Sequence, residues 1–242
     1  MSALAAGPDI EIRVRAEVYA FLSRCVQYPR ESISLGLIGH VQFDDEVLEE
    51  ARINVVDGSA GDLPSLQAGH RVLFPAVESQ DSPSYETAYS RRDVFRQAQV
   101  MADVAGFYAA HGLTVGGSKR DRQDGIGPEL EFMGFLSAKQ AHAAESGNAD
   151  ASELCVDTQR SFLRDHLGGW GPDYGNRMAA VSDHAFYSAL GRFLHAWLSA
   201  DMERLGVVPL GVDDIDERAR GDVVPVPDPQ VGWDDLNCGG AV

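Results

Sequence analysis

The chain has 242 residues, with 37 acidic and 20 basic side chains and a formal net charge of −17 at pH 7. Hydrophobic residues make up 44% of the sequence, which is enough for a sizeable core and typical of a soluble globular protein. A surface this acidic repels phosphate backbones and anionic membranes, so composition argues against nucleic-acid binding and membrane-surface binding.

The cysteine and lysine contents of the sequence indicate a reducing compartment and a high-salt environment. The three cysteines are far apart and form no CxxC pair, which is typical of a protein kept reduced. No secretory signal pattern opens the chain and no apolar run of about 18 residues occurs, so we expect a cytoplasmic protein without membrane insertion. Lysine is almost absent, being found only at Lys119 and Lys139. Together with the acidity, this suggests a halophilic protein whose carboxylates keep its surface hydrated.

Helical periodicity dominates from residue 12 to residue 205. Apolar residues at steps of three and four predict helices over about 12–28, 46–53, 64–74, 94–112, 129–144, 152–167 and 183–205. Pro29 and Gly112 are expected to end two of them, and Gly168 with Gly169 a third. Residues 75–90 lack this period and are expected to form an ordered loop or an extended segment, whereas 116–127 are expected to form a polar glycine-rich connection.

The predicted fold class is all-α. The valine-rich stretches VVPLGV and VVPVP are interrupted by proline and make poor strands. We expect a single-domain bundle of roughly seven to nine helices over residues 1–206. Residues 207–242 are expected to be an acidic, proline-rich tail, extended or disordered.

Sequence motifs for metal, nucleotide or nucleophile chemistry are missing from the chain. No glutamate has a histidine three residues later, HExxH and GxSxG do not occur, and no Cys/His cluster has zinc spacing. The stretch GLTVGGSK fails as a phosphate loop because its lysine follows the serine. We therefore predict no catalytic residue, no metal site and no bound cofactor.

Three segments carry unusual residue combinations. In SPSYETAY (82–89), Tyr85 and Tyr89 flank Glu86. Two aromatic faces beside a carboxylate suit the binding of an arginine-containing peptide. Alternatively, the two tyrosines pack this loop onto the core. In 121–133, Asp121 and Asp124 lie in a glycine-rich loop before a helix, where capping by Asp124 and Glu129 is the simpler interpretation. In 162–174, FLRDHLGGWGPDY places a histidine one turn after a phenylalanine and before a tryptophan, as a packed helix end would also do.

Together these segments resemble the TorD/DmsD/NarJ family of redox-enzyme maturation chaperones, with the likeness closest to members serving type II enzymes of the dimethyl-sulfoxide-reductase class. The resemblance is carried by five motifs in order over about residues 12–205, namely PSYETAY (83–89), ADVAGFY (102–108), DGIGPELEFM (124–133), FLRDHLGGWGPDY (162–174) and FYSAL (186–190). One motif departs from the family pattern, because Gln123 and Gly125 stand where the family has the proline and the histidine of its Pro-Asp-His loop.

The resemblance implies an all-helical cytoplasmic chaperone, of haloarchaeal type on its composition, acting as a monomer or dimer. Its partner would be the precursor of a molybdopterin-dependent catalytic subunit, held by its twin-arginine leader while the cofactor is inserted. An arginine-bearing apolar leader needs carboxylates beside an apolar groove. The expected peptide-binding residues are Asp121, Asp124 and Glu86 for the arginines, Tyr19, Tyr85, Tyr89, Phe107 and Trp170 for the apolar wall, and Glu129 and His166 beside them.

Two other functions stay open at this stage. The first is a small helical enzyme whose site is assembled in space from His166, Asp124 and Glu129, which requires these side chains to meet in a deep pocket. The second is a structural assembly subunit, in which an apolar helix face is an interface rather than part of the core.

Overall fold

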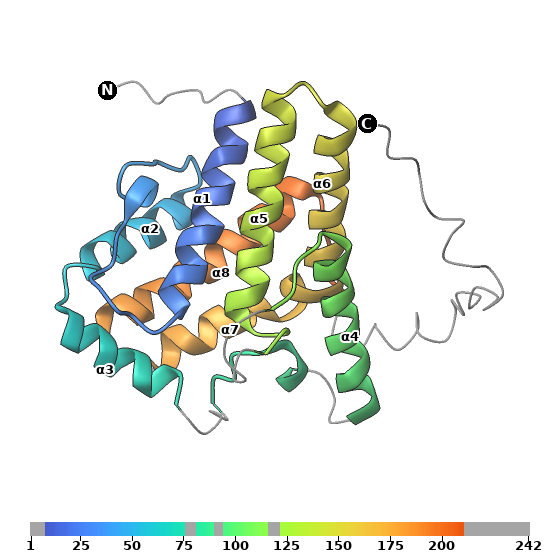
Figure 1. Ribbon diagram of the computed structural model, residues 1–242. Helices are drawn as coiled ribbons and strands as arrows, with labels where there is room; N and C mark the ends of the chain where they lie inside the picture. Colours follow the sequence, from blue (N-terminus) through green and yellow to red (C-terminus); the bar gives the residue numbers. More distant parts are fainter. Residues whose placement is uncertain (1–7, 76–80, 90–93, 116–121, 211–242) are drawn as a thin grey trace.

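The computed structural model describes residues 8–75, 81–89, 94–115 and 122–210, and these fold into a helical bundle (Figure 1). The α-helices of this part of the chain are α1 (Pro8–Val26), α2 (Glu46–Gly58), α3 (Leu63–Leu73), α4 (Val94–Ala110), α5 (Ile126–Glu145), α6 (Ala149–Phe162), α7 (Gly168–Val181) and α8 (Ala185–Leu205). Short 3-10 turns lie at η1 (Gly36–Gly39) and η2 (Glu86–Ala88). Within the described ranges, β pairing is limited to one isolated bridge, so the all-α prediction is confirmed.

Two pairs of helices form the centre of the bundle. α1 lies along α5, and α7 lies along α8, with α2 covering α8 and α6 beside α5 (Figure 1). The axes of α7 and α8 approach closely because glycines face each other: a Cβ on Gly191 would lie only 2.5 Å from the carbonyl oxygen of Gly175. The apolar stripe of α1 packs inward as predicted, since Tyr19, Leu22 and Val26 are all buried.

One ion pair lies inside this core. Nε and Nη2 of Arg15 on α1 donate to the two carboxylate oxygens of Asp201 on α8, at 2.6 and 2.9 Å. The hydroxyl of Tyr19 donates to the same carboxylate at 2.7 Å. Both charged side chains are almost completely buried, so each depends on the other for its charge to be tolerated there.

Local capping explains several helix ends. The side chains of Asp45 and Asp62 accept hydrogen bonds from the backbone N–H groups at the starts of α2 and α3. The cap of α2 is Asp45, and α2 continues to Gly58, beyond the predicted end at residue 53. Gly206 ends α8 in the left-handed conformation, with φ of 66°.

The prediction that Gly168 and Gly169 end a helix is wrong. The chain passes from α6 through a single π turn, η3 (Leu163–Leu167), directly into α7, which contains Pro172. Residues Trp170, Tyr174 and Met178 recur every four positions and are all buried. Burial of that face outweighs the low helix propensity of the glycines and the proline, and the preceding π turn already interrupts the regular hydrogen-bond ladder.

The remaining sequence predictions concern membrane-spanning helices, the cysteines and the C-terminal tail, and some of these residues lie outside the described ranges. No helix of the described residues has the length and apolarity needed to cross a membrane. Cys25 and Cys155 are both free and buried, whereas Cys238 lies outside the described ranges. The predicted acidic tail lies outside them from residue 211 onward.

Candidate functional site

The 82–89 segment is fixed to the start of α5. The backbone N–H of Glu86 donates to the carbonyl of Asp124 at 2.8 Å, and the N–H of Ile126 donates to the carbonyl of Ser84 at 2.9 Å. These two bonds form the antiparallel bridge between Tyr85 and Gly125. Two of the motifs singled out in the sequence are therefore in direct contact.

Asp124 reinforces this attachment with its side chain. Its Oδ2 accepts from the hydroxyl of Thr87 at 2.7 Å and from the backbone N–H of Thr87 at 3.2 Å. Arg122 donates to both oxygens, from Nε at 2.9 Å and from Nη2 at 3.1 Å. Burial would raise the pKa of Asp124, but the hydrogen bonds from Arg122 and Thr87 outweigh it and hold the pKa below its ordinary value. Asp124 is thus a buried carboxylate, fully engaged within the protein.

Behind the segment lies a buried carboxylate–histidine cluster, formed by Glu86, Glu129 and His166. Nδ1 of His166 lies 3.1 Å from Oε2 of Glu86. On the other side of the ring, Nε2 lies 3.3 Å from Oδ2 of Asp103, an ion-pair distance without the direction of a hydrogen bond. His166 belongs to the π turn η3, which aims its ring at the 82–89 segment.

The charges of this cluster depend on each other. Burial alone would lower the pKa of His166, but Asp103 and Glu86 outweigh burial and raise it to about 10. The imidazole is therefore a cation at neutral pH. The same ion pair holds the pKa of Asp103 below its ordinary value, whereas burial raises the pKa of Glu86 and His166 offsets only part of that rise.

Glu129 is the most deeply buried acid of the cluster. Its Oε2 accepts from the indole Nε1 of Trp170 at 3.0 Å, and its Oε1 has no hydrogen-bond partner within the described part of the chain. Burial, together with the nearby charge of Glu86, raises the pKa of Glu129 well above its usual value, so the neutral acid is favoured. This carboxyl joins α5 to α7 rather than facing solvent.

Apart from Tyr85, the aromatic residues predicted for the site divide into three locations. Tyr89 packs on Trp170 with ring centres 5.3 Å apart, and its hydroxyl donates to the carbonyl of Pro83. Phe107 on α4 is partly buried and lies 5.4 Å from the His166 ring. Tyr19 is elsewhere, in the core against Trp197.

A groove of about 1700 Å³ lies beside the junction of the 82–89 segment and α5. Its walls come from the end of α1 and residues 27–34, the end of α3, residues 82–85, residues 113–115 and the first turns of α5. Apolar side chains contribute much of the lining, among them Val26, Ile33, Phe74, Leu113, Val115 and Phe135. The charged side chains in the lining are more basic than acidic, with Arg24, Arg30, Arg71 and Arg122 against Glu31 and Glu131.

The structure brings together most, but not all, of the residues predicted from the sequence. Tyr85 is the one that lines the groove itself, because Asp124, Glu86, Glu129, His166 and Trp170 are buried behind it. Asp121 lies outside the described residues. Sequence reasoning missed Arg122 and Thr87, although a cation two residues before an acidic loop residue and a threonine after a glutamate give little signal on their own.

Gly125, which replaces the histidine of the family pattern, also lines the groove. Its φ of −85° is open to every residue, so the backbone does not require glycine there. A Cβ at this position would lie 3.2 Å from the carbonyl oxygen of Arg122, a tight contact. The glycine leaves this wall of the groove without a side chain.

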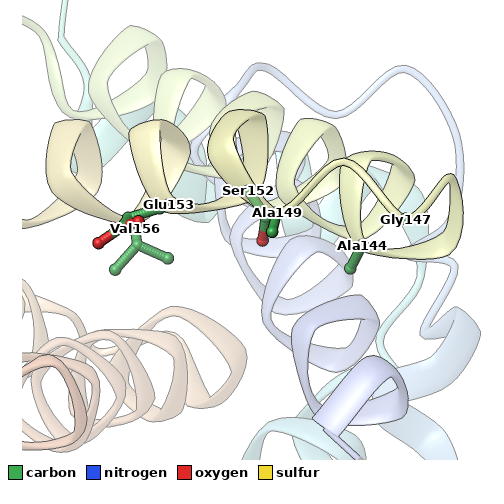
Figure 2. A pocket seen from close by; sticks show the side chains of 6 residues that line it. All are labelled: Ala144, Gly147, Ala149, Ser152, Glu153 and Val156. Atoms are coloured by element: carbon green, nitrogen blue, oxygen red, sulfur yellow. The ribbon is translucent and has the colours of Figure 1, made fainter.

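A second, smaller hollow of about 410 Å³ lies at the turn between α5 and α6 (Figure 2). It is lined by Ala144, Gly147, Ala149, Ser152, Glu153 and Val156. These are mostly small residues with a single charged group, unlike the convergent polar groups of a ligand site. Across the described ranges, no three His, Cys, Asp or Glu side chains are placed to hold a metal ion.

The geometry also bears on the two competing functions. The enzyme hypothesis needed His166, Asp124 and Glu129 to meet in a pocket, but Asp124 bonds to Arg122 and Thr87, and His166 pairs with Glu86 and Asp103. The exposed large apolar side chains of the described residues come from separate elements, such as Val47 on α2, Val72 on α3 and Leu154 on α6. They therefore give no specific support to a permanent subunit interface.

An apolar groove on a helical bundle is a feature that peptide-binding proteins use. The family described as "Nitrate reductase delta subunit" matches residues 44–174, and the chain belongs to this TorD/DmsD/NarJ family of redox-enzyme maturation chaperones.

Individual relatives are also named as chaperones. The "Chaperone protein TorD" of Aeromonas salmonicida is 34% identical over 158 residues, which cover 65% of this chain and 67% of that protein. The "Chlorate reductase assembly chaperone protein" of Ideonella dechloratans is 30% identical over 155 residues, 64% of this chain and 77% of the relative. The "Perchlorate reductase assembly chaperone protein" of Dechloromonas aromatica is 34% identical over 107 residues, but that match spans only 46% of the relative and 44% of this chain.

Proposed function

We propose that this protein is a cytoplasmic chaperone for the catalytic subunit of a molybdopterin-dependent reductase of the type II class. It binds the twin-arginine leader of the precursor and keeps the subunit in the cytoplasm until its cofactor is inserted. Family membership supports the chaperone role, because the relatives are named as assembly chaperones of chlorate, perchlorate and selenate reductases. On this proposal the protein has no catalytic activity of its own.

The observation that carries the proposal is the groove beside Tyr85 and the start of α5. A leader peptide has an apolar stretch, and the groove offers apolar side chains from several helices to cover it. Its volume of about 1700 Å³ exceeds that of an ordinary small-molecule pocket, which is about 300–1,000 Å³, and suits a peptide.

Long-range charge does not explain recognition of the arginines, because the described lining of the groove has more arginines than glutamates. If the acidic composition reflects a halophilic origin, the net charge of −17 is also screened within about 3 Å in roughly 1 M salt. Binding must then rest on apolar burial and on contact with particular side chains.

Co-purification tests this proposal. The tagged chaperone, expressed with a reductase precursor in high salt, is expected to retain the precursor with its leader and to lose it when the leader is deleted. Val115→Asp places a charge in the groove lining and is expected to abolish retention, whereas Val72→Asp places one on an exposed face of α3 outside the groove. Equal retention by both variants would show that the groove is not the binding site.

A further inference from the structure

Arg122 is held by the side chains of Asp124, Tyr85 and Thr87. Its two hydrogen bonds to the Asp124 carboxylate, at 2.9 and 3.1 Å, form the parallel fork that guanidinium groups make with carboxylates. Its guanidinium carbon lies 4.1 Å from the centre of the Tyr85 ring, the geometry of a cation–π contact. Nη2 also donates to the hydroxyl of Thr87 at 2.8 Å. The three side chains together form a cradle for the guanidinium group.

Arg122 also stands between this cradle and the groove. Asp124 is 0% exposed, whereas the side chain of Arg122 is 37% exposed and lines the groove together with Tyr85. A cation that approaches along the groove therefore meets the positive charge of Arg122 before it can reach the carboxylate. An arginine from outside can contact Asp124 only when Arg122 has moved away.

We propose that Asp124, Tyr85 and Thr87 form a guanidinium-binding subsite, which Arg122 fills in the free protein and an arginine of the partner peptide fills after displacing it. This inference rests on the proposed function and specifies how the groove recognises the arginine of that peptide. Displacement does not require a helix to unfold, because Arg122 lies in the connection that precedes α5.

Exchange of one guanidinium for another keeps the buried carboxylate paired. Thr87 continues to donate two hydrogen bonds to Asp124 during the exchange, so the carboxylate stays in place while Arg122 leaves. A lysine from the partner could not replace Arg122 equally well, because an ammonium group cannot form the parallel fork or stack flat on a ring. The subsite thus distinguishes arginine from lysine in the partner peptide.

The test is the affinity of Arg122→Ala for a fluorescently labelled twin-arginine leader peptide, measured by anisotropy. Without an internal guanidinium to displace, the variant is expected to bind at least about tenfold more tightly than the wild type, which corresponds to about 1.4 kcal/mol. Arg24→Ala is the matched control, since it removes another arginine of the groove lining, whereas the described hydrogen bonds of the Asp124 side chain come from Arg122 and Thr87. Its affinity is expected to change much less.

A second peptide and a second variant make the result decisive. The tightening is expected for the twin-arginine peptide and to be much smaller for a twin-lysine peptide. Arg122→Lys keeps a positive charge and the fold but loses the fork, so it is expected to bind with intermediate affinity. If the wild type binds the peptide and both Arg122 variants bind it equally or more weakly, Arg122 is structural and the exchange is wrong. If neither the wild type nor the variants bind the peptide, the proposed function fails together with this inference.

Discussion

The ion pair between His166 and Glu86 gives a quantitative test of how the 82–89 segment is held. His166→Gln removes the cation and leaves the carboxyl of Glu86, which is only 7% exposed, without a charged partner. A buried carboxyl in this situation takes up a proton. Keeping it neutral at pH 7, about 2.7 units above the ordinary glutamate pKa of about 4.3, costs about 3.7 kcal/mol.

Because the pKa of Glu86 is already raised in the wild type, His166→Gln is expected to lower the free energy of unfolding by at most about 3–4 kcal/mol at pH 7. At pH 5 the loss is expected to shrink to about 1 kcal/mol, because protonating the glutamate there costs little. Urea denaturation followed by tryptophan fluorescence measures both values. A loss of the same size at both pH values would refute this account of the ion pair.

The double variant Glu86→Gln/His166→Gln serves as the control, since it has no buried charge at either position. It is expected to be more stable than His166→Gln alone at pH 7. In the wild type, the pKa of His166 is raised to about 10, so the protonated imidazole, compared with a neutral one, stabilises the fold by its full amount below the ordinary histidine pKa of about 6.5. That contribution is lost as the pH rises through about 10, and the double variant is expected to lack this alkaline loss.

Three further predictions concern the bundle and its surface. Gly191→Ala is expected to cost about 1–3 kcal/mol in urea denaturation, because its Cβ would strike Gly175, whereas Gly106→Ala in open space is expected to be neutral or stabilising by roughly 0.5–1 kcal/mol. Asp201→Asn leaves Arg15 buried without its anion and is expected to cost about 3–5 kcal/mol, as the loss of one member of a buried pair does. If the acidic surface is halophilic, the melting temperature measured by circular dichroism is expected to rise steeply between about 0.1 M and about 2 M KCl; full stability at the lower concentration would contradict this.

Periodicity and capping rules were sufficient for the fold class and for most helices. The stripe Tyr19, Leu22 and Val26 is buried as its spacing requires, and Gly206 ends the last helix. The rules failed at Gly168 to Pro172, where burial of a face bearing Trp170 overrides local helix-breaking tendencies. Such an override depends on contacts with α8, which the sequence of that segment alone does not reveal.

The candidate site was predictable in its parts but not in its arrangement. The motifs around Tyr85, Asp124 and His166 were recognisable, and the structure places them side by side. Which acids face solvent could not be read from the sequence, because Asp124 and Glu86 look like exposed loop residues until their partners are known. Arg122 is the clearest case: the sequence gives no sign that it matters, and only the structure reveals its contacts with Asp124 and Tyr85.

The most direct measurement of the central claim is the binding of a reductase leader peptide to the purified wild-type protein at high salt. The account predicts saturable binding of the twin-arginine peptide, weaker binding of a twin-lysine version, and a loss of affinity of at least about tenfold in Tyr85→Ala, which removes an aromatic face from the groove wall. Binding that is absent, or that is unaffected both by lysine substitution and by Tyr85→Ala, would contradict it.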